Sequence, residues 1–356
     1  GRYDYFSNTK LVFCCIHFVL CIMLSALKSI ELSSTVKEIV RWLELFLIYY
    51  LTINLINDKK KMRIILYSMF LTVVMVSILG IVNYLSMGHR AISFFGNPNP
   101  MAGYINLIIP VIIGMLMSSV LLWERITLGI FFVLSIVSWF LTFSRSAWLS
   151  LIIAMIFFSF LNKIKRRAIF ISLIMFSIFT VIVLSTNVKN DVIDRSGLRR
   201  VLWSVEFRIR CYPIGFNMVK DDLIVGIGAG NYKILIKKYV ETVTSIHRYV
   251  RRLVVDANLH SLYLQVFVET GLLGLSAFVF LLVCLIRHLM KKLKMLEHSR
   301  NYGLFVGLVG GVVVYLLNNL SEVLTVHGIH LQWGIILGLA IVLTQLREAE
   351  ECPEMV

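Results

Sequence analysis

The sequence predicts an all-α fold, a polytopic bundle of about ten transmembrane helices with a large extracytoplasmic loop between the seventh and eighth. The chain is 58% hydrophobic, only 15% of its residues are charged, and its mean hydropathy is +0.84. Such a composition excludes an ordinary soluble domain and a disordered chain. Apolar runs long enough to cross a hydrocarbon core of about 30 Å, which takes about 20 helical residues, recur along the sequence.

The predicted spans are apolar stretches, and the sixth of them is short. They lie near residues 11–27, 38–56, 64–86, 101–122, 126–143, 147–161, 169–186, 262–286, 303–325 and 330–346. This gives four regions: helices one to seven in 1–186, an extracytoplasmic loop at 187–260, helices eight to ten in 261–347, and a cytoplasmic tail at 348–356. No small-residue cleavage site follows the first run, so we interpret it as an uncleaved helix.

Short basic loops set the orientation. Residues 57–63, 162–167 and 287–300 are rich in Lys and Arg, and the span count places them on one side of the membrane. The positive-inside rule makes that side cytoplasmic, together with both termini. The 86–100 loop, the Ser144–Arg145 corner, the 187–260 loop and the 326–329 turn then face outward.

The large loop is basic although it faces outward. It carries thirteen Lys or Arg against seven Asp or Glu, and the whole chain has a net charge of +15. Loops longer than about 60 residues escape the positive-inside rule, so the charge needs another explanation. An anionic phosphate ligand and general attraction to lipid headgroups both fit, whereas nucleic acid is a poor candidate.

Metal and nucleotide motifs do not occur. The six cysteines show no CxxC spacing, and no DxD, HExxH or P-loop pattern is found, so we expect no metal and no cofactor. Gly226-Ile-Gly228-Ala-Gly230 lacks the context of a dinucleotide site, and we interpret it as a turn toward the membrane, with a backbone anion nest as an alternative. Gly303, Gly307 and Gly311 recur every four residues, which favours close helix packing.

His260 lies where the large loop enters the eighth span. A histidine side chain changes charge near neutral pH and can accept a proton there, although a purely structural hydrogen-bonding role is the alternative. Asp256 precedes it by four residues. In a helix that spacing would let the carboxylate orient the imidazole.

Three arginines are candidate anion ligands. Arg145 interrupts an apolar stretch, which costs at least about 2.5 kcal/mol unless the side chain reaches water or a partner. It is therefore a candidate site residue, with snorkelling to the outer surface as the alternative. Arg208 and Arg210 belong to a basic, aromatic-containing segment. Guanidinium groups bind phosphate oxygens bidentately, but a solvated or membrane-surface segment fits as well.

Further polar residues lie near the outer ends of spans. Asn97-Pro98-Asn99-Pro100 predicts a turn and a helix start. Glu269 and Glu322 lie inside predicted spans, where they would pair with Arg145 or line a cavity. Glu44 and Arg41 are one turn apart, and we assign that pair to structure.

The motifs resemble those of one family. His260-Ser261, nine residues and then Gly271-Leu-Leu-Gly274 are similar to the H[NSQ]-X9-G-X-X-G signature of bacterial O-antigen ligases, and Arg145 with Leu149 is similar to their R-X3-L element. The stretches at 97–104 and 215–232 also resemble family sequences. The resemblance covers residues 96–274, to the O-antigen ligase and O-antigen polymerase superfamily. Arg208 matches the loop arginine, and Tyr212 stands where tryptophan is more usual.

The resemblance implies a metal-independent glycosyltransferase in the bacterial cytoplasmic (inner) membrane, with its active site facing outward. Its donor would be a glycan on undecaprenyl or another polyprenyl pyrophosphate, and its acceptor a sugar hydroxyl or lipid core. Arg145 and Arg208 would hold the pyrophosphate. His260 would act on the acceptor hydroxyl, as general base or as its orienting partner. Arg210, Asn99 and Glu269 are further candidates for binding pyrophosphate or glycan. Family members commonly have about twelve spans, so the ten predicted here are consistent with a missing N-terminal part.

Two distinctions stay open. A ligase delivers finished polymer to another molecule, such as lipopolysaccharide core, whereas a polymerase joins repeat units still on the carrier. From another class, a transporter or flippase would move the lipid-linked glycan unchanged. Such proteins show inverted repeats and charges near the midplane. This chain gathers its polar groups at the outer face, which favours the enzyme in polysaccharide biosynthesis for the cell envelope.

Overall fold

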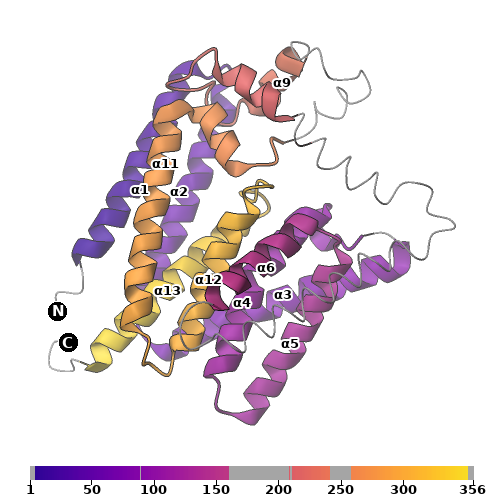
Figure 1. Ribbon diagram of the computed structural model, residues 1–356, viewed down its shortest axis with the longest axis vertical. Helices are drawn as coiled ribbons and strands as arrows, with labels where there is room; N and C mark the ends of the chain where they lie inside the picture. Colours follow the sequence, from indigo (N-terminus) through magenta and orange to yellow (C-terminus); the bar gives the residue numbers. More distant parts are fainter. Residues whose placement is uncertain (1–4, 89, 160–207, 209–210, 241–257, 352–356) are drawn as a thin grey trace.

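The computed structural model describes residues 5–88, 90–159, 208, 211–240 and 258–351. Within these ranges the regular elements are helices (Figure 1), so the predicted all-α class is confirmed for this part of the chain. The helices are α1 (Tyr5–Ser25), α2 (Leu32–Leu55), α3 (Lys59–Met87), α4 (Pro98–Ser118), α5 (Leu122–Leu141), α6 (Arg145–Ser159), α9 (Tyr232–Val240), α11 (Leu262–Met295), α12 (Tyr302–Asn318) and α13 (Ile329–Glu351), with short 3-10 turns η1 (Ala26–Lys28) and η2 (Ser93–Phe95). Nine of the predicted spans coincide with these helices, and the span predicted at 169–186 lies outside the described residues.

The predicted count of about ten spans is not confirmed. By length and composition, six of the described helices can cross a membrane: α1, α3, α4, α5, α11 and α13. Helices α6 and α12 are apolar but shorter. Helix α2 is long enough, but Lys37, Glu38, Arg41 and Glu44 make it more polar than an ordinary span.

The helices pack in pairs across the bundle, of which α1–α11 and α4–α12 are antiparallel and α2–α13 is parallel. Helix α1 lies along α11, α2 along α13, and α4 along α12 (Figure 1). Helix α12 also packs against α13. Because α13 contacts α2 and α12 contacts α4 and α6, these two helices connect α2 to the group formed by α3, α4, α5 and α6.

The closest helix contact is between α4 and α12. A Cβ built on Gly114 would lie 2.4 Å from the Gly303 carbonyl oxygen, and one on Gly307 would lie 2.5 Å from the Pro110 oxygen. A Cβ on Gly311 would likewise lie 2.6 Å from a carbonyl oxygen of α4. The predicted packing role of the glycine repeat on α12 is therefore confirmed, because only residues without a side chain allow this approach.

Connections between helices gather at two ends. At the first, which we call the site end, the α3–α4, α5–α6 and α12–α13 connections meet the start of α11: Ala91 N donates to Leu141 O at 2.9 Å, and Leu262 N donates to Asn319 O at 3.0 Å. At the opposite end, Arg63 of α3 pairs with Glu124 of α5 at 2.9 Å. This grouping is the one expected from spans that alternate in direction.

Tight packing of α4 on α12 predicts a specific loss of stability. Gly114→Ala should destabilise the protein by about 1–3 kcal/mol, because the methyl group would overlap the backbone of α12. Thermal unfolding of the purified protein in detergent measures this. Gly129→Ala on α5 is the control, since its Cβ would meet nothing within 4 Å. Equal melting temperatures for the two variants would contradict the prediction.

Candidate functional site

Glu322 lies in the connection between α12 and α13. The predicted span at 303–325 includes it, which is wrong because α12 ends at Asn318. The Asn319 side chain stabilises the turn: its Nδ2 donates to Tyr315 O at 2.9 Å, and its Oδ1 accepts from Leu324 N at 2.9 Å. Glu322 is consequently held at the site end with a side chain that is 10% exposed.

Three segments converge on the Glu322 carboxylate. Arg208 Nη2 and Asn99 Nδ2 both bond to its Oε1, at 2.6 and 2.7 Å. His260 Nδ1 lies 3.6 Å from the other oxygen, Oε2. The two oxygens therefore have different neighbours, one facing the arginine and the amide, the other facing the imidazole.

Arg90 extends this arrangement and was missed by sequence reasoning. Its Nη2 donates to Asn99 Oδ1 at 3.2 Å, and its Nε donates to Thr142 O at 2.6 Å. Burial lowers the pKa of Arg90, and the Arg145 and Arg208 charges lower it further, while Glu322 opposes them. One signal was available, since Arg90 is an arginine in a short loop that the sequence predicts to face outward, where the positive-inside rule disfavours it.

These six residues form what we call the polar cluster: Arg90, Asn99, Arg145, Arg208, His260 and Glu322. Arg145 is exposed at the start of α6, and its guanidinium also feels the charge of Arg208. The cluster holds three guanidinium groups and one carboxylate, which leaves an excess of two positive charges with the imidazole counted as neutral. Such an excess suits an anion with two negative groups.

The backbone around the cluster is strained. Among the described residues, the non-glycine residues with positive φ are Ser93 (47°), Phe143 (49°), His260 (52°) and His327 (53°). Each lies in a connection at the site end. Left-handed conformations at non-glycine residues are uncommon and cost free energy, and they concentrate at functional sites. The strain thus coincides with the candidate site.

Gly271 interrupts α11 nine residues beyond Leu262. Its φ and ψ of 64° and −163° are not helical, and they leave backbone groups on both sides without helical partners. Residues 223–228 supply those partners: Ile227 N and Gly228 N donate to Val268 O and Glu269 O, whereas Leu272 N and Leu273 N donate to Leu223 O and Ile224 O. A Cβ on Gly271 would lie 2.3 Å from Ile224 O. The first glycine of the G-X-X-G element is therefore required by this crossing.

The glycine turn at residues 226–230 is anchored to the α1–α2 connection and to the start of α2. Gly226, Gly228 and Gly230 all have positive φ, which confirms the predicted turn. Asn231 is completely buried; its Oδ1 accepts from Glu31 N at 2.9 Å, and its Nδ2 donates to Thr35 Oγ1 at 3.0 Å. The large loop is thereby bonded both to α11, through Val268 O and Glu269 O, and to the α1–α2 region, through Asn231.

The remaining predicted site residues have separate environments. Glu269 is buried, and its Oε1 accepts from Tyr232 N at 3.3 Å and from Gln265 Nε2 at 3.5 Å. These two described hydrogen bonds are thus with the returning loop and with its own helix α11, and not with the polar cluster. Arg210 and Asp256 lie outside the described residues. The carboxylate beside His260 in the described structure is that of Glu322.

Two smaller predictions concern pairing and metals. Arg41 was expected to pair with Glu44, but its described partner is Glu38, while Glu44 Oε2 lies 3.5 Å from His330 Nε2. Both carboxylates are one turn from Arg41, so spacing alone could not choose between them. Within the described residues no group of three or more His, Cys, Asp or Glu side chains is arranged to hold a metal ion.

Several apolar helices long enough to cross a membrane indicate an integral membrane protein. Residues 130–279 match the family model described as O-antigen ligase, so this segment is similar to that family. The resemblance of the sequence motifs is thereby confirmed. No curated protein matched the chain. The match supports a membrane glycan transferase of the O-antigen ligase type.

The break at Gly271 can be tested by substitution. Gly271→Ala should lower the melting temperature and the yield of folded protein, because it adds both backbone strain and an overlap with Ile224 O. The control is Gly88→Ala, whose φ is also positive at 65° but whose Cβ would meet nothing within 4 Å. It should cost only the strain of about 1–2 kcal/mol for a left-handed residue. Equal loss in both variants would show that the crossing is unimportant.

Proposed function

We propose that this protein transfers a glycan from a polyprenyl-pyrophosphate carrier to a sugar hydroxyl at the outer face of the bacterial cytoplasmic membrane. The observation that carries the proposal is the polar cluster. It combines excess positive charge with an imidazole at one end of a bundle of apolar helices. The family match over residues 130–279 supports the same class of reaction.

The donor's charge fits the cluster's charge. Each phosphate of a pyrophosphate that links a lipid to a sugar carries one negative charge at neutral pH. The two excess positive charges of the cluster would neutralise them. Arg145 and Arg208 would form bidentate hydrogen bonds to the phosphates, and Arg208 would exchange its bond to Glu322 for the donor. These groups would also stabilise the charge that grows on the leaving oxygen during reaction. Guanidinium groups can supply this stabilisation without a metal, so we propose a metal-independent reaction.

His260 would remove the proton of the acceptor. The acceptor oxygen forms a bond to the anomeric carbon as the bond from that carbon to the pyrophosphate oxygen breaks, and the pyrophosphate keeps the electron pair. The hydroxyl proton passes to Nε2 of His260, the nitrogen not directed at Glu322. Attack from the face opposite the leaving group inverts the configuration of the sugar.

Glu322 would couple donor binding to the orientation of His260. Its Oε1 accepts from Arg208, which is the arginine proposed for the pyrophosphate. An arriving pyrophosphate competes for this guanidinium and weakens its bond to Glu322. The carboxylate stays close to Nδ1 of His260, initially 3.6 Å away, and can then hold the imidazole in one orientation.

A transporter of lipid-linked glycan is the competing function. Purified protein incubated with a polyprenyl-pyrophosphate glycan and candidate acceptors, with and without a chelator, separates the two. Mass analysis of the products should show a new glycosidic bond and released carrier pyrophosphate under both conditions. An unchanged donor would favour the transporter, and activity that needs an added divalent ion would refute the metal-free reaction. The acceptor that is consumed distinguishes ligase from polymerase.

Removal of the imidazole should abolish most of the transfer. His260→Ala is expected to reduce kcat by about 10²–10⁴-fold, the usual contribution of a general base. Turnover is measured in the same mass assay, and folding is checked by thermal unfolding. His17→Ala is the control, because His17 is exposed on α1. Retained turnover in His260→Ala would remove this residue from the mechanism.

The proposed coupling predicts a split between kcat and KM for Glu322→Gln. The variant keeps the shape of the side chain but loses its charge, so kcat should fall about 10–100-fold, as for other residues that orient a functional histidine. The donor KM should stay equal or decrease, because the internal competitor for Arg208 is weakened. Glu322→Asp should restore part of kcat. A raised donor KM with normal kcat would show that Glu322 only supports the fold.

A further inference from the structure

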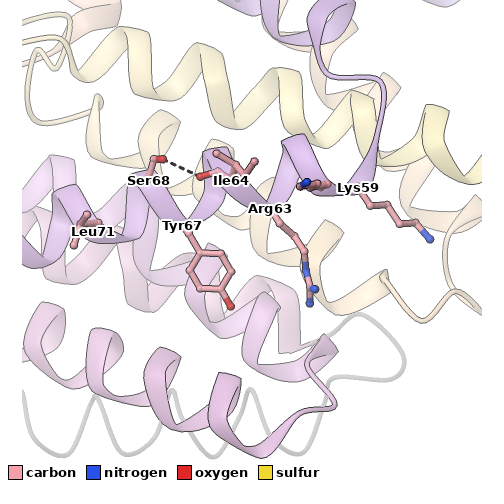
Figure 2. A pocket seen from close by; sticks show the side chains of 7 residues that line it. Lys59, Arg63, Ile64, Tyr67, Ser68 and Leu71 are labelled. Atoms are coloured by element: carbon pink, nitrogen blue, oxygen red, sulfur yellow. Dashed lines mark hydrogen bonds between the residues drawn. The ribbon is translucent and has the colours of Figure 1, made fainter.

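A groove runs along α3 at the end of the bundle opposite the polar cluster (Figure 2). Its volume is about 620 Å³, and residues from the first four turns of the helix line it: Lys59, Lys60, Arg63, Ile64, Tyr67, Ser68 and Leu71. The cationic residues occupy the helix start, and the apolar residues follow. The groove therefore changes from basic to apolar along its length.

Arg63 is fixed at the basic part of the groove. Its Nη2 donates to Oε1 of Glu124 at 2.9 Å, and the Tyr67 hydroxyl donates to the same oxygen at 2.8 Å. Figure 2 shows Arg63 and Tyr67 pointing to the same side of α3. Glu124 is 2% exposed, whereas the Arg63 side chain is 55% exposed. A guanidinium has five N–H donors, so the bond to Glu124 leaves donors directed at the groove.

The apolar part of the groove extends toward the middle of the bundle. Ile64 and Leu71 are each 56% exposed, and the Ser68 hydroxyl donates to Ile64 O at 2.9 Å, so its polar group is satisfied within the helix. At 1.5 Å per residue, Leu71 lies about 12 Å beyond Arg63 along the axis. That depth is close to half the hydrocarbon thickness, about 15 Å. The exposed apolar surface thus matches an acyl chain.

We infer that this groove binds an anionic phospholipid of the surrounding bilayer. The phosphate would contact Lys59, Lys60 and Arg63, and one acyl chain would cover Ile64 and Leu71. Charge complementarity selects an anionic headgroup, and basic residues at this end of a span attract such lipids. The apolar wall argues for a lipid and against a free phosphate, which would leave that wall uncovered. The inference does not depend on glycan transfer.

Binding is tested on the purified full chain with phosphatidylglycerol and phosphatidylcholine, by native mass spectrometry in detergent. Phosphatidylglycerol should be retained preferentially. The double variant Lys59→Gln, Lys60→Gln should weaken that binding on the order of 30-fold, from about 1 kcal/mol for each basic residue. Arg63 is left intact, because its removal would leave the buried Glu124 charge without its cationic partner.

Two further variants make the result specific. Lys61→Gln is the matched control, because Lys61 pairs with Asn57 at 2.6 Å and does not line the groove. It should retain near-normal binding. Ile64→Trp keeps every charge but fills the apolar part, and it should also reduce binding. Equal retention of the two lipids, equal effects of Lys61→Gln and the double variant, or displacement by millimolar inorganic phosphate would each overturn the inference.

Discussion

The site end depends on the bonding of one buried carboxylate. Glu322 is held by Arg208 from the large loop and by Asn99 from the start of α4, with His260 from the start of α11 beside it. A buried charge is costly unless it is paired and hydrogen-bonded, so each of these segments is confined to the place where it satisfies Glu322. Arg90, in the α3–α4 connection, donates to Asn99 and to Thr142. It thereby links the α3–α4 and α5–α6 connections to the same ionic centre. A single ionic centre thereby aligns groups that are distant in sequence.

The residues of the cluster have different origins along the chain. Arg145, Arg208 and His260 belong to the segment that matches the O-antigen ligase family, whereas Arg90, Asn99 and Glu322 lie outside it. The matched segment thus contains the groups to which we assign the chemistry. The surrounding helices supply the acceptors and donors that position them. The glycine contact between α4 and α12 brings these outside contributors together, since Asn99 begins one helix and Glu322 follows the other.

Helices and candidate cations could be predicted from sequence because their signals are local. Hydropathy located nine of the described helices but not α9, which lies within the predicted large loop. The Asn97 side chain accepts from Asn99 N at 2.9 Å, as expected for a cap before prolines. Pairing could not be predicted. Glu322 was placed inside a span because apolar residues surround it, and the end of α12 is set by hydrogen bonds of Asn319. Arg90 was missed because the positive-inside signal does not identify its partners, Asn99 and Thr142, which folding brings near it.

The interruption of α11 at Gly271 has a consequence for exchanging parts between related proteins. Residues 262–270 bond to the returning loop through the carbonyls of Val268 and Glu269, and the loop also accepts from Leu272 and Leu273 just beyond the break. The outer turns of α11 are therefore a structural unit with the loop. A chimera that grafts a foreign loop should place its junction after Leu273, because a junction at Ser261 would separate the two halves of this unit.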